Sequence, residues 1–258
     1  MILLAIPFGL VIGLIVGAVG GGGAILALPV LVYILDEPVG PASAASLIVV
    51  ALAAAVGAGS LARDGRVCWR LALTFSVPSA AASLLGAIGN QAVSGPALIL
   101  SFVPVMLVAA FATWQRSGAS GGGEDSSCPE VARGRIVVAG VGVGLLTGFF
   151  GVGGGFVIVP VLALWFGMGF RRAVATSLVI IAITGAVALA SHLLAGAHVD
   201  AGITAALAGA TAAGALLGTL IAERLPQEAL GKGFALVVTA VAIFLLVDTL
   251  VLGGPPVS

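Results

Sequence analysis

Charged side chains are scarce in this sequence. Only 8% of its 258 residues are Asp, Glu, Lys or Arg and 60% are apolar, whereas soluble domains carry about 25% charged residues. A soluble core cannot bury that much apolar surface, so the composition excludes an ordinary soluble domain and indicates a protein whose solvent is lipid. Ten basic and ten acidic residues give no net charge, so no nucleic-acid partner is expected.

Cysteine is also rare, and no motif for chemistry stands out. The spacing of Cys68 and Cys128 indicates neither a metal site nor a disulfide framework, so we expect both to be structurally incidental. Ser191 precedes His192, but neighbouring side chains on a helix point about 100° apart and do not readily form a nucleophile and base pair. The sequence therefore predicts no enzyme and no cofactor.

Long apolar stretches fill the rest of the chain, and a membrane span needs roughly 20 such residues. Four stretches precede a polar region rich in Ser, Gly and charge, and four follow it: 2–35, 42–61, 71–89, 97–114, 136–170, 173–194, 201–222 and 233–252. The polar region predicts a flexible linker. The predicted domains are an N-terminal transmembrane repeat over 1–114, a cytoplasmic linker over 115–135 and a C-terminal transmembrane repeat over 136–258.

The two groups of segments are related copies. Residues 17–31 (GAVGGGGAILALPVL) align without gaps on residues 148–162 (GFFGVGGGFVIVPVL), so that position 17 matches position 148 at an offset of 131 residues. At the same offset, 44–47 (AASL) aligns on 175–178 (ATSL). Collinear glycine and proline positions over about half of each repeat are hard to obtain by chance, so a duplication is predicted.

Basic residues favour the cytoplasmic side near helix ends, and their positions differ between the copies. In the first half, Arg63, Arg66 and Arg70 lie between the second and third segments, and no Lys or Arg lies between the first and second. In the second half, Arg171 and Arg172 lie between the first and second segments, and no Lys or Arg lies between the second and third. Such opposite bias at equivalent loops is typical of repeats with inverted topology. All ten basic residues fall on one side if the first segment of the second half enters the membrane and returns.

The length of that segment also predicts that it folds back. A continuous helix over 136–170 would extend about 50 Å, whereas the hydrocarbon core is roughly 30 Å thick. The glycine runs at 20–23 and 151–155 divide the first segment of each half into a longer and a shorter arm. The predicted fold is an all-α polytopic membrane protein with two inverted-topology repeats. Each repeat is a glycine-tipped broken-helix hairpin plus three transmembrane helices, about ten membrane segments in all.

The hairpin tips are the predicted substrate site. A helix broken inside a membrane exposes backbone groups that protein or a watery cavity must satisfy. The arms that begin near Ala24 and Gly155 present helix N-termini, which favour an anion, and no Lys or Arg lies in the middle of a predicted span. Hydroxyl groups nearby add further donors. The predicted substrate-binding residues are Gly21, Gly22, Gly23, Ser46, Gly153, Gly154, Gly155, Thr176 and Ser177.

Helix packing is the alternative interpretation for part of this pattern. A Ser or Thr in a span often bonds only to its own helix carbonyl. Other glycines recur every four residues, a spacing that lets membrane helices approach closely, and we expect packing to be their role. These are Gly9, Gly13, Gly17, Gly140, Gly144 and Gly148.

A glycine cluster, then an apolar pair and proline, then an Ala-Thr-Ser-Leu step resembles the sulfite exporter TauE/SafE family of membrane permeases. The second half carries the closer likeness, with Gly151, Gly153, Gly154, Gly155, Pro160, Ala175, Thr176 and Ser177 in the expected order. In the first half Ala24 stands where the glycine run would continue and Ala45 where the threonine would stand. The resemblance implies export of sulfite or of a small organosulfonate such as sulfoacetate.

Together these features predict a secondary transporter that exports a small anion between two hairpin tips. A passive anion channel and a non-transporting structural subunit are the alternatives. The expected partners are the anion and the lipid bilayer, and a homo-oligomer is compatible with the sequence. We expect a multi-pass protein of a bacterial inner membrane, with the basic loops and the linker in the cytoplasm and the C-terminus outside.

Overall fold

The computed structural model is all-helical, as predicted, and describes residues 2–21, 24–35, 37, 39–90, 95–119, 128–150, 155–194 and 200–249. The first half contains α1 (Ile2–Val19), α2 (Ala24–Pro29) with the π-helical turn η2 (Val30–Ile34), α3 (Val39–Arg63), α4 (Trp69–Asn90) and α5 (Gly95–Ala119). The second half contains α6 (Arg133–Phe150), α7 (Gly155–Pro160) with the π-helical turn η3 (Val161–Trp165), α8 (Phe170–Leu194), α9 (Ala201–Arg224) and α10 (Gln227–Val247).

The break predicted at the first glycine run is confirmed, and residues 151–154 of the second run lie outside the described residues. The first segment of each half is a long helix followed by a separate short one, α1 then α2 and α6 then α7. Gly20 follows α1 with φ +82°, a backbone conformation that glycine adopts without the steric cost other residues meet. In both halves the π-helical turn begins directly after the proline that ends the short helix, where the missing proline N–H removes one α-helical hydrogen bond.

Helices extend into both ends of the central polar region. Helix α5 continues to Ala119 and α6 begins at Arg133, so helices occupy both ends of the stretch predicted as linker. Residues 120–127 lie outside the described part of the chain. The helices extend because Gln115, Arg116, Arg133 and Arg135 are good helix formers, even though they are too polar to count toward a membrane span.

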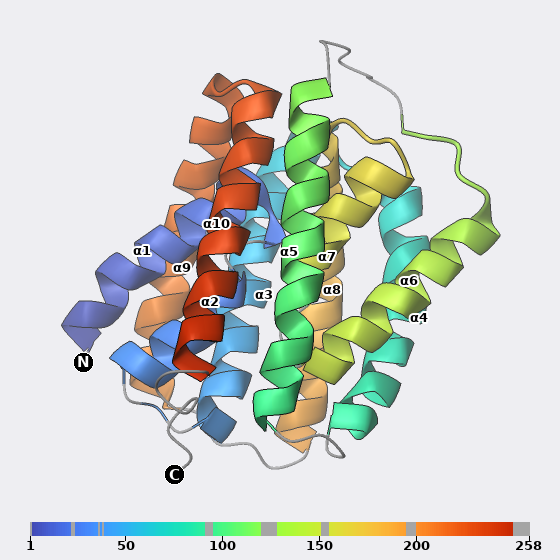
Figure 1. Ribbon diagram of the computed structural model, residues 1–258. Coiled ribbons are helices and arrows are strands. Elements are labelled where there is room, and N and C mark those ends of the chain that lie inside the picture. Colours follow the sequence, from blue (N-terminus) through green and yellow to red (C-terminus); the bar gives the residue numbers. More distant parts are fainter. Residues whose placement is uncertain are drawn as a thin grey trace.

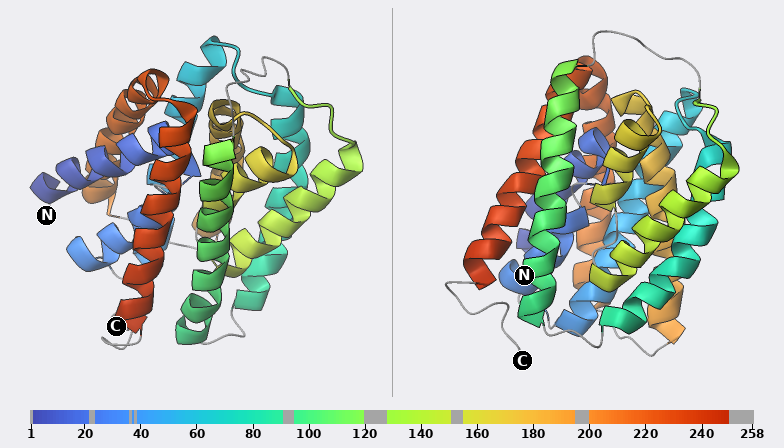
Figure 2. Two further views of the ribbon diagram at one scale, coloured as in Figure 1. Left: turned by 45° about the horizontal axis from the view of Figure 1, so that its top comes forward. Right: turned by 45° about the vertical axis from the view of Figure 1, so that its right-hand side comes forward.

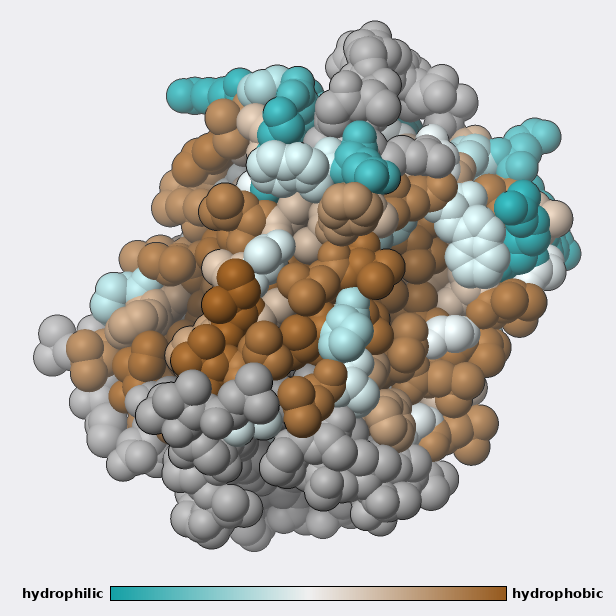
Figure 3. All heavy atoms as spheres, in the orientation of Figure 1, coloured by the Kyte–Doolittle hydropathy of each residue, from teal (hydrophilic) through white to brown (hydrophobic). Residues whose placement is uncertain are grey.

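Five helices of the described residues are long and apolar enough to cross a membrane. They are α3 from Pro41, α6, α8 as far as Ala190, α9 and α10. Large apolar side chains point outward, for example Val77 at 72% exposure and Val108 at 69%, which suits a surface that meets lipid. Figure 3 shows apolar residues across the middle of the visible face, below a group of hydrophilic residues at one end.

The two halves interlock through their first helices. Helix α1 packs against α9, and α6 packs against α4, so each half places its first helix on the other half. In Figure 1, α1 rises from the lower left toward the middle of the molecule and α6 descends from the upper right. Helices α5 and α10 pack together along one side, as both views in Figure 2 show.

Glycine makes these two helix contacts possible. A Cβ atom added at Gly13 would lie 2.8 Å from Ala215 N, and one added at Gly144 would lie 2.8 Å from Ser79 Cα. Both distances are shorter than real Cβ atoms show, so the helix backbones touch directly. A Cβ atom at Gly9, Gly17, Gly140 or Gly148 would meet α9 or α4 at similarly short distances. The predicted packing role of all six glycines is therefore confirmed.

Candidate functional site

One residue from each predicted hairpin tip meets the other inside the protein. Gly21, at the first tip, lies against Gly155, the first residue of α7, and both are buried. A Cβ atom added at Gly155 would lie 2.6 Å from Gly21 Cα, and one added at Gly21 would overlap the Gly155 backbone. The short helices α2 and α7 also contact each other. The tertiary fold thus brings together two predicted site residues that are far apart in the sequence.

Ser177 is the predicted hydroxyl that joins this contact. Its side chain is 0% exposed, and a Cβ atom added at Gly20 would lie 2.9 Å from Ser177 Oγ. In this structure Ser177 Oγ donates a hydrogen bond to Val174 O over 2.8 Å. The hydroxyl is therefore next to the first tip, and it must rotate away from its own helix before it can donate to a substrate.

Thr176, the neighbouring predicted residue, is also 0% exposed but has a different environment. Its Oγ1 atom accepts a hydrogen bond from the backbone N–H of Cys68 over 3.2 Å. Cys68 lies in the loop between α3 and α4. Thr176 therefore connects α8 to that loop, one residue before the serine that contacts the tips.

Ser46 stands apart from this cluster. Helices α3 and α8 run antiparallel, because a Cβ atom at Gly57 would meet Leu178 at 3.2 Å and one at Gly185 would meet Ala51 at 3.0 Å. Ser46 lies eleven residues before Gly57, which corresponds to about 17 Å along the helix. Its Oγ donates to Ser43 O over 2.8 Å. Ser46 is therefore distant from Ser177 along the contact of α3 with α8. The predicted site residues Gly153 and Gly154 lie outside the described residues, and the role of Ser46 stays a prediction.

Four predicted site residues lie outside the described residues. They are Gly22, Gly23, Gly153 and Gly154, and the substrate-binding role predicted for them also stays a prediction.

Sequence reasoning used Arg66 and Arg171 only for membrane orientation, but the structure places both beside the first hairpin. They line a cavity of about 20 Å³ together with Gly17 and Val174, a volume that suits about one water molecule. Arg66 forms an ion pair with Glu223 over 3.3 Å. The buried Nε of Arg171 has no hydrogen-bond partner among the described residues. The charge pattern at the helix ends was the only signal in the sequence that pointed to these residues.

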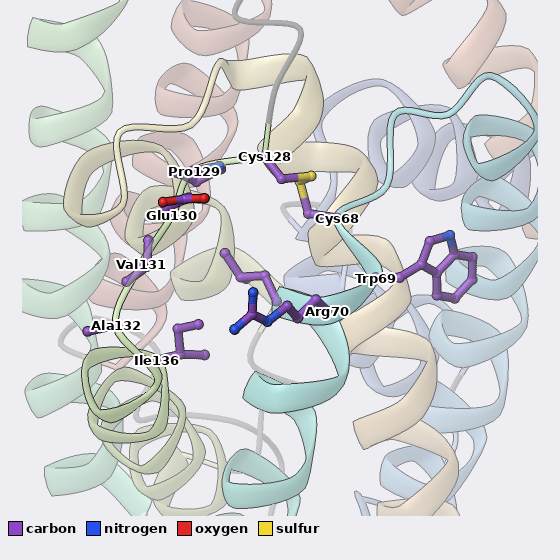
Figure 4. Close-up of a pocket in the computed structure, with 10 residues that line it drawn as sticks. Cys68, Trp69, Arg70, Cys128, Pro129, Glu130, Val131, Ala132 and Ile136 are labelled. Carbon is purple, nitrogen blue, oxygen red and sulfur yellow. A yellow bond between two sulfur atoms is a disulfide. The ribbon is translucent and has the colours of Figure 1, made fainter.

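Cys68 and Cys128 form a disulfide, so the prediction that both are incidental is wrong. Their Cα atoms are 5.7 Å apart although 60 positions separate them in the sequence. Spacing along the chain could not show this pair, because the contact exists only after the segment before α6 folds over the loop between α3 and α4. Figure 4 shows the disulfide at the edge of a pocket of about 530 Å³, with Arg70 and Glu130 among its walls.

Known proteins share this sequence pattern over most of the chain. Residues 5–245 match the family model described as "Sulfite exporter TauE/SafE". The chain is 30% identical over 258 residues to a "Probable membrane transporter protein" of Xylella fastidiosa strain 9a5c, and the alignment covers 95% of each protein. A "Probable membrane transporter protein" of Methanocaldococcus jannaschii is 29% identical over 205 residues, which cover 75% of this chain and 74% of that protein. No solved structure matches significantly.

Proposed function

Since the chain belongs to the TauE/SafE sulfite exporter family of membrane transporters, we propose that it exports sulfite or a small organosulfonate through a site between its hairpin tips. As a multi-pass membrane protein of a transporter family, it is not an enzyme. The observation that carries the proposal is the direct contact of Gly21 with Gly155, beside the hydroxyl of Ser177. Backbone N–H groups and hydroxyls at such a junction can bind an oxyanion without a buried Lys or Arg.

Transport requires the tips to separate. A single Cβ atom does not fit between Gly21 and Gly155, so an oxyanion cannot lie between these two residues in the arrangement seen here. Close glycine contacts hold α1 on α9 and α6 on α4. We infer that each hairpin moves as a unit with a helix of the other half, and that relative motion of the two units exposes the tips to one side and then to the other.

The interlocking of the halves supports inverted repeats. Gly17 meets the backbone of Ala215 in one contact, and Gly148 meets the backbone of Ser83 in the other. Gly17 and Gly148 are equivalent positions of the duplication, and Ser83 and Ala215 precede matching Leu-Leu-Gly triplets. A two-fold rotation that exchanges the halves would therefore place the Gly17 contact on the Gly148 contact. Inverted repeats related by a two-fold axis require this.

Basic residues from both halves gather at one end of the molecule. Arg66 of the first half pairs with Glu223 of the second, and Arg172 contacts the sulfur atoms of Cys68 and Cys128. We propose that this end faces the cytoplasm of a bacterial cell. Arg66 and Arg171 would then attract an anion to the side from which export begins, at the cavity that leads toward Gly17.

Flux of labelled sulfite and sulfoacetate into proteoliposomes tests the proposal. We expect saturable flux that responds to membrane potential, because moving one charge across 100 mV is worth about 2.3 kcal/mol, or an approximately fiftyfold concentration ratio. Unlabelled anion on the opposite side should accelerate exchange through a carrier. Flux that rises linearly with concentration and shows no exchange would favour the channel alternative, and no flux of any anion would favour the structural subunit.

A Ser177→Ala variant should weaken transport by raising KM about tenfold, since a hydrogen bond to a charged group contributes about 1.5–3 kcal/mol. Thr184→Ala is the matched control, because Thr184 is also buried on α8 and its hydroxyl donates to Ile180 O over 2.8 Å. The measurement is the concentration dependence of initial flux for both variants. Equal KM values for Ser177→Ala and Thr184→Ala would remove Ser177 from the proposed site.

A further inference from the structure

The disulfide lies where three elements meet. Cys68 immediately precedes α4, Cys128 stands in the segment before α6, and Arg172 lies in the first turn of α8. Arg172 Nη1 is 3.8 Å from Cys68 Sγ and 3.5 Å from Cys128 Sγ. The backbone N–H of Cys68 also donates to Thr176 Oγ1. The two sulfur atoms thus contact a cation, and the backbone of Cys68 is bonded to the helix that carries Ser177.

The two cysteines differ in access to solvent. Cys68 is 2% exposed, whereas Cys128 is exposed. Both line the pocket of about 530 Å³, and Figure 4 shows the disulfide at its upper edge. A small molecule in this pocket therefore reaches Cys128 first.

The location of the pair decides what the disulfide can do. Disulfides in the cytoplasm are usually transient, because cellular thiols keep cysteines reduced. The proposed cytoplasmic orientation of the basic end places this pair in that environment. We propose that Cys128 and Cys68 form a thiol–disulfide exchange site for small disulfides of the glutathione class. This inference depends on the orientation given under the proposed function, but not on which anion is transported.

The exchange proceeds in two balanced steps. The Cys128 thiolate attacks one sulfur of glutathione disulfide, so a bond between Cys128 and glutathione forms, the glutathione S–S bond breaks and one glutathione leaves as thiolate. The Cys68 thiolate then attacks Cys128 Sγ, forms the intramolecular disulfide and releases the second glutathione. The cysteines are oxidised, glutathione disulfide is reduced, and the two cysteine protons end on two glutathione molecules. Arg172 stabilises the thiolates that these steps require.

The bridge has a structural consequence for the second hairpin. In the oxidised state it ties the segment that enters α6 to the loop that enters α4, across the pocket that both segments line. Helix α6 is the long arm of that hairpin, and the tied loop contacts Thr176 next to the tips. Oxidation therefore restrains the proposed cytoplasmic side of the transporter, where an export substrate enters.

Mass spectrometry of the full-length protein in glutathione buffers tests the exchange without any transport assay. We expect the pair to convert between dithiol and disulfide as the ratio of reduced to oxidised glutathione changes. A Cys68→Ser variant should accumulate one glutathione on Cys128, whereas Cys128→Ser should gain little on Cys68. A bridge that persists in excess reduced glutathione, thiols that persist in excess glutathione disulfide, or preferential modification of Cys68 would overturn the proposal.

An Arg172→Gln substitution tests the role of the cation. We expect it to slow glutathione addition to Cys128 about fivefold, the factor supplied by one charge about 4 Å away in an aqueous environment. Arg224→Gln is the control, because Arg224 is an exposed basic residue that ends α9, whereas Arg172 contacts both sulfur atoms. Both variants are first checked for a monodisperse peak in size-exclusion chromatography. Equal rates in the two variants would contradict the assignment.

Labelling with a membrane-impermeant maleimide tests the compartment. After mild reduction, Cys128 should react in inverted membrane vesicles and stay unlabelled in intact cells. Labelling in intact cells would place the pair outside, where disulfides persist, and would overturn the exchange site. Labelling measures only on which side of the membrane Cys128 lies. The exchange site can therefore be tested even if the protein does not transport sulfite or sulfoacetate.

Discussion

Replacement of Gly21 with alanine is expected to reduce transport by more than about a hundredfold. The new Cβ atom would overlap the backbone of Gly155, and because both contact partners are backbone atoms, no side chain can rotate to make room. The tips must move apart, and a shift of about 1 Å in the geometry of a functional site can cost a factor of about a hundred. Gly155→Ala should act similarly, since its Cβ would lie 2.6 Å from Gly21 Cα and 2.8 Å from Ile181 Cδ1.

The measurement is initial flux in proteoliposomes at matched protein content. Gly59→Ala on α3 and Gly142→Ala on α6 are matched controls, because a Cβ atom at either position meets no atom within 4 Å. Thermal stability in detergent separates a damaged site from an unfolded protein. Native flux in a folded Gly21→Ala variant would show that the contact seen here is not part of the transport pathway.

Replacement of Gly144 with leucine should destabilise the protein by about 3 kcal/mol or more. A side chain at this position would enter the backbone of α4 at Ser79, and inserting atoms into a closely packed contact typically costs 1–3 kcal/mol even where side chains can adjust. Here the neighbour is a helix backbone, so the cost lies at the top of that range or above it. We expect a lower melting temperature in detergent and less folded protein in the membrane.

Gly142→Leu provides a close control, because Gly142 lies two positions away on the same helix, is exposed and has open space beside it. Gly13→Leu tests the other half, since its side chain would enter the backbone of α9 at Thr211. If the two halves are related by a two-fold axis, Gly13→Leu and Gly144→Leu should lower stability by similar amounts. A Gly144→Leu variant as stable as Gly142→Leu would contradict the packing of α6 on α4.

The sequence alone predicted the helical segments and the place where two of them break. The signals were local: apolar runs of the length of a membrane span, and glycine clusters that no helix interior favours. The spacing of Gly9, Gly13 and Gly17 also predicted close packing correctly, because a four-residue period places glycines on one helix face. It did not identify α9 as the helix they contact, since a periodic stripe does not specify its partner.

Contacts between distant parts of the chain required the tertiary structure. Ser46 and Ser177 occupy matching positions of the predicted repeat, but only the fold reveals that Ser177 lies beside Gly20 of the other half. Until one contact between the halves is known, a position within a repeat does not specify which residues of the other half it meets. The same limit hid the pairing of Cys68 with Cys128.

The sequence by itself determined the lipid environment of this protein, its helices and the break after its first helix, and it predicted a duplication. Each depends on residues close together in the chain or on a comparison of two stretches. Only the tertiary structure decided that Gly21 meets Gly155, that each first helix packs on the opposite half, and that Cys68 bonds Cys128. Those contacts join residues far apart in the chain, and they follow from the way helix backbones approach where glycine leaves room.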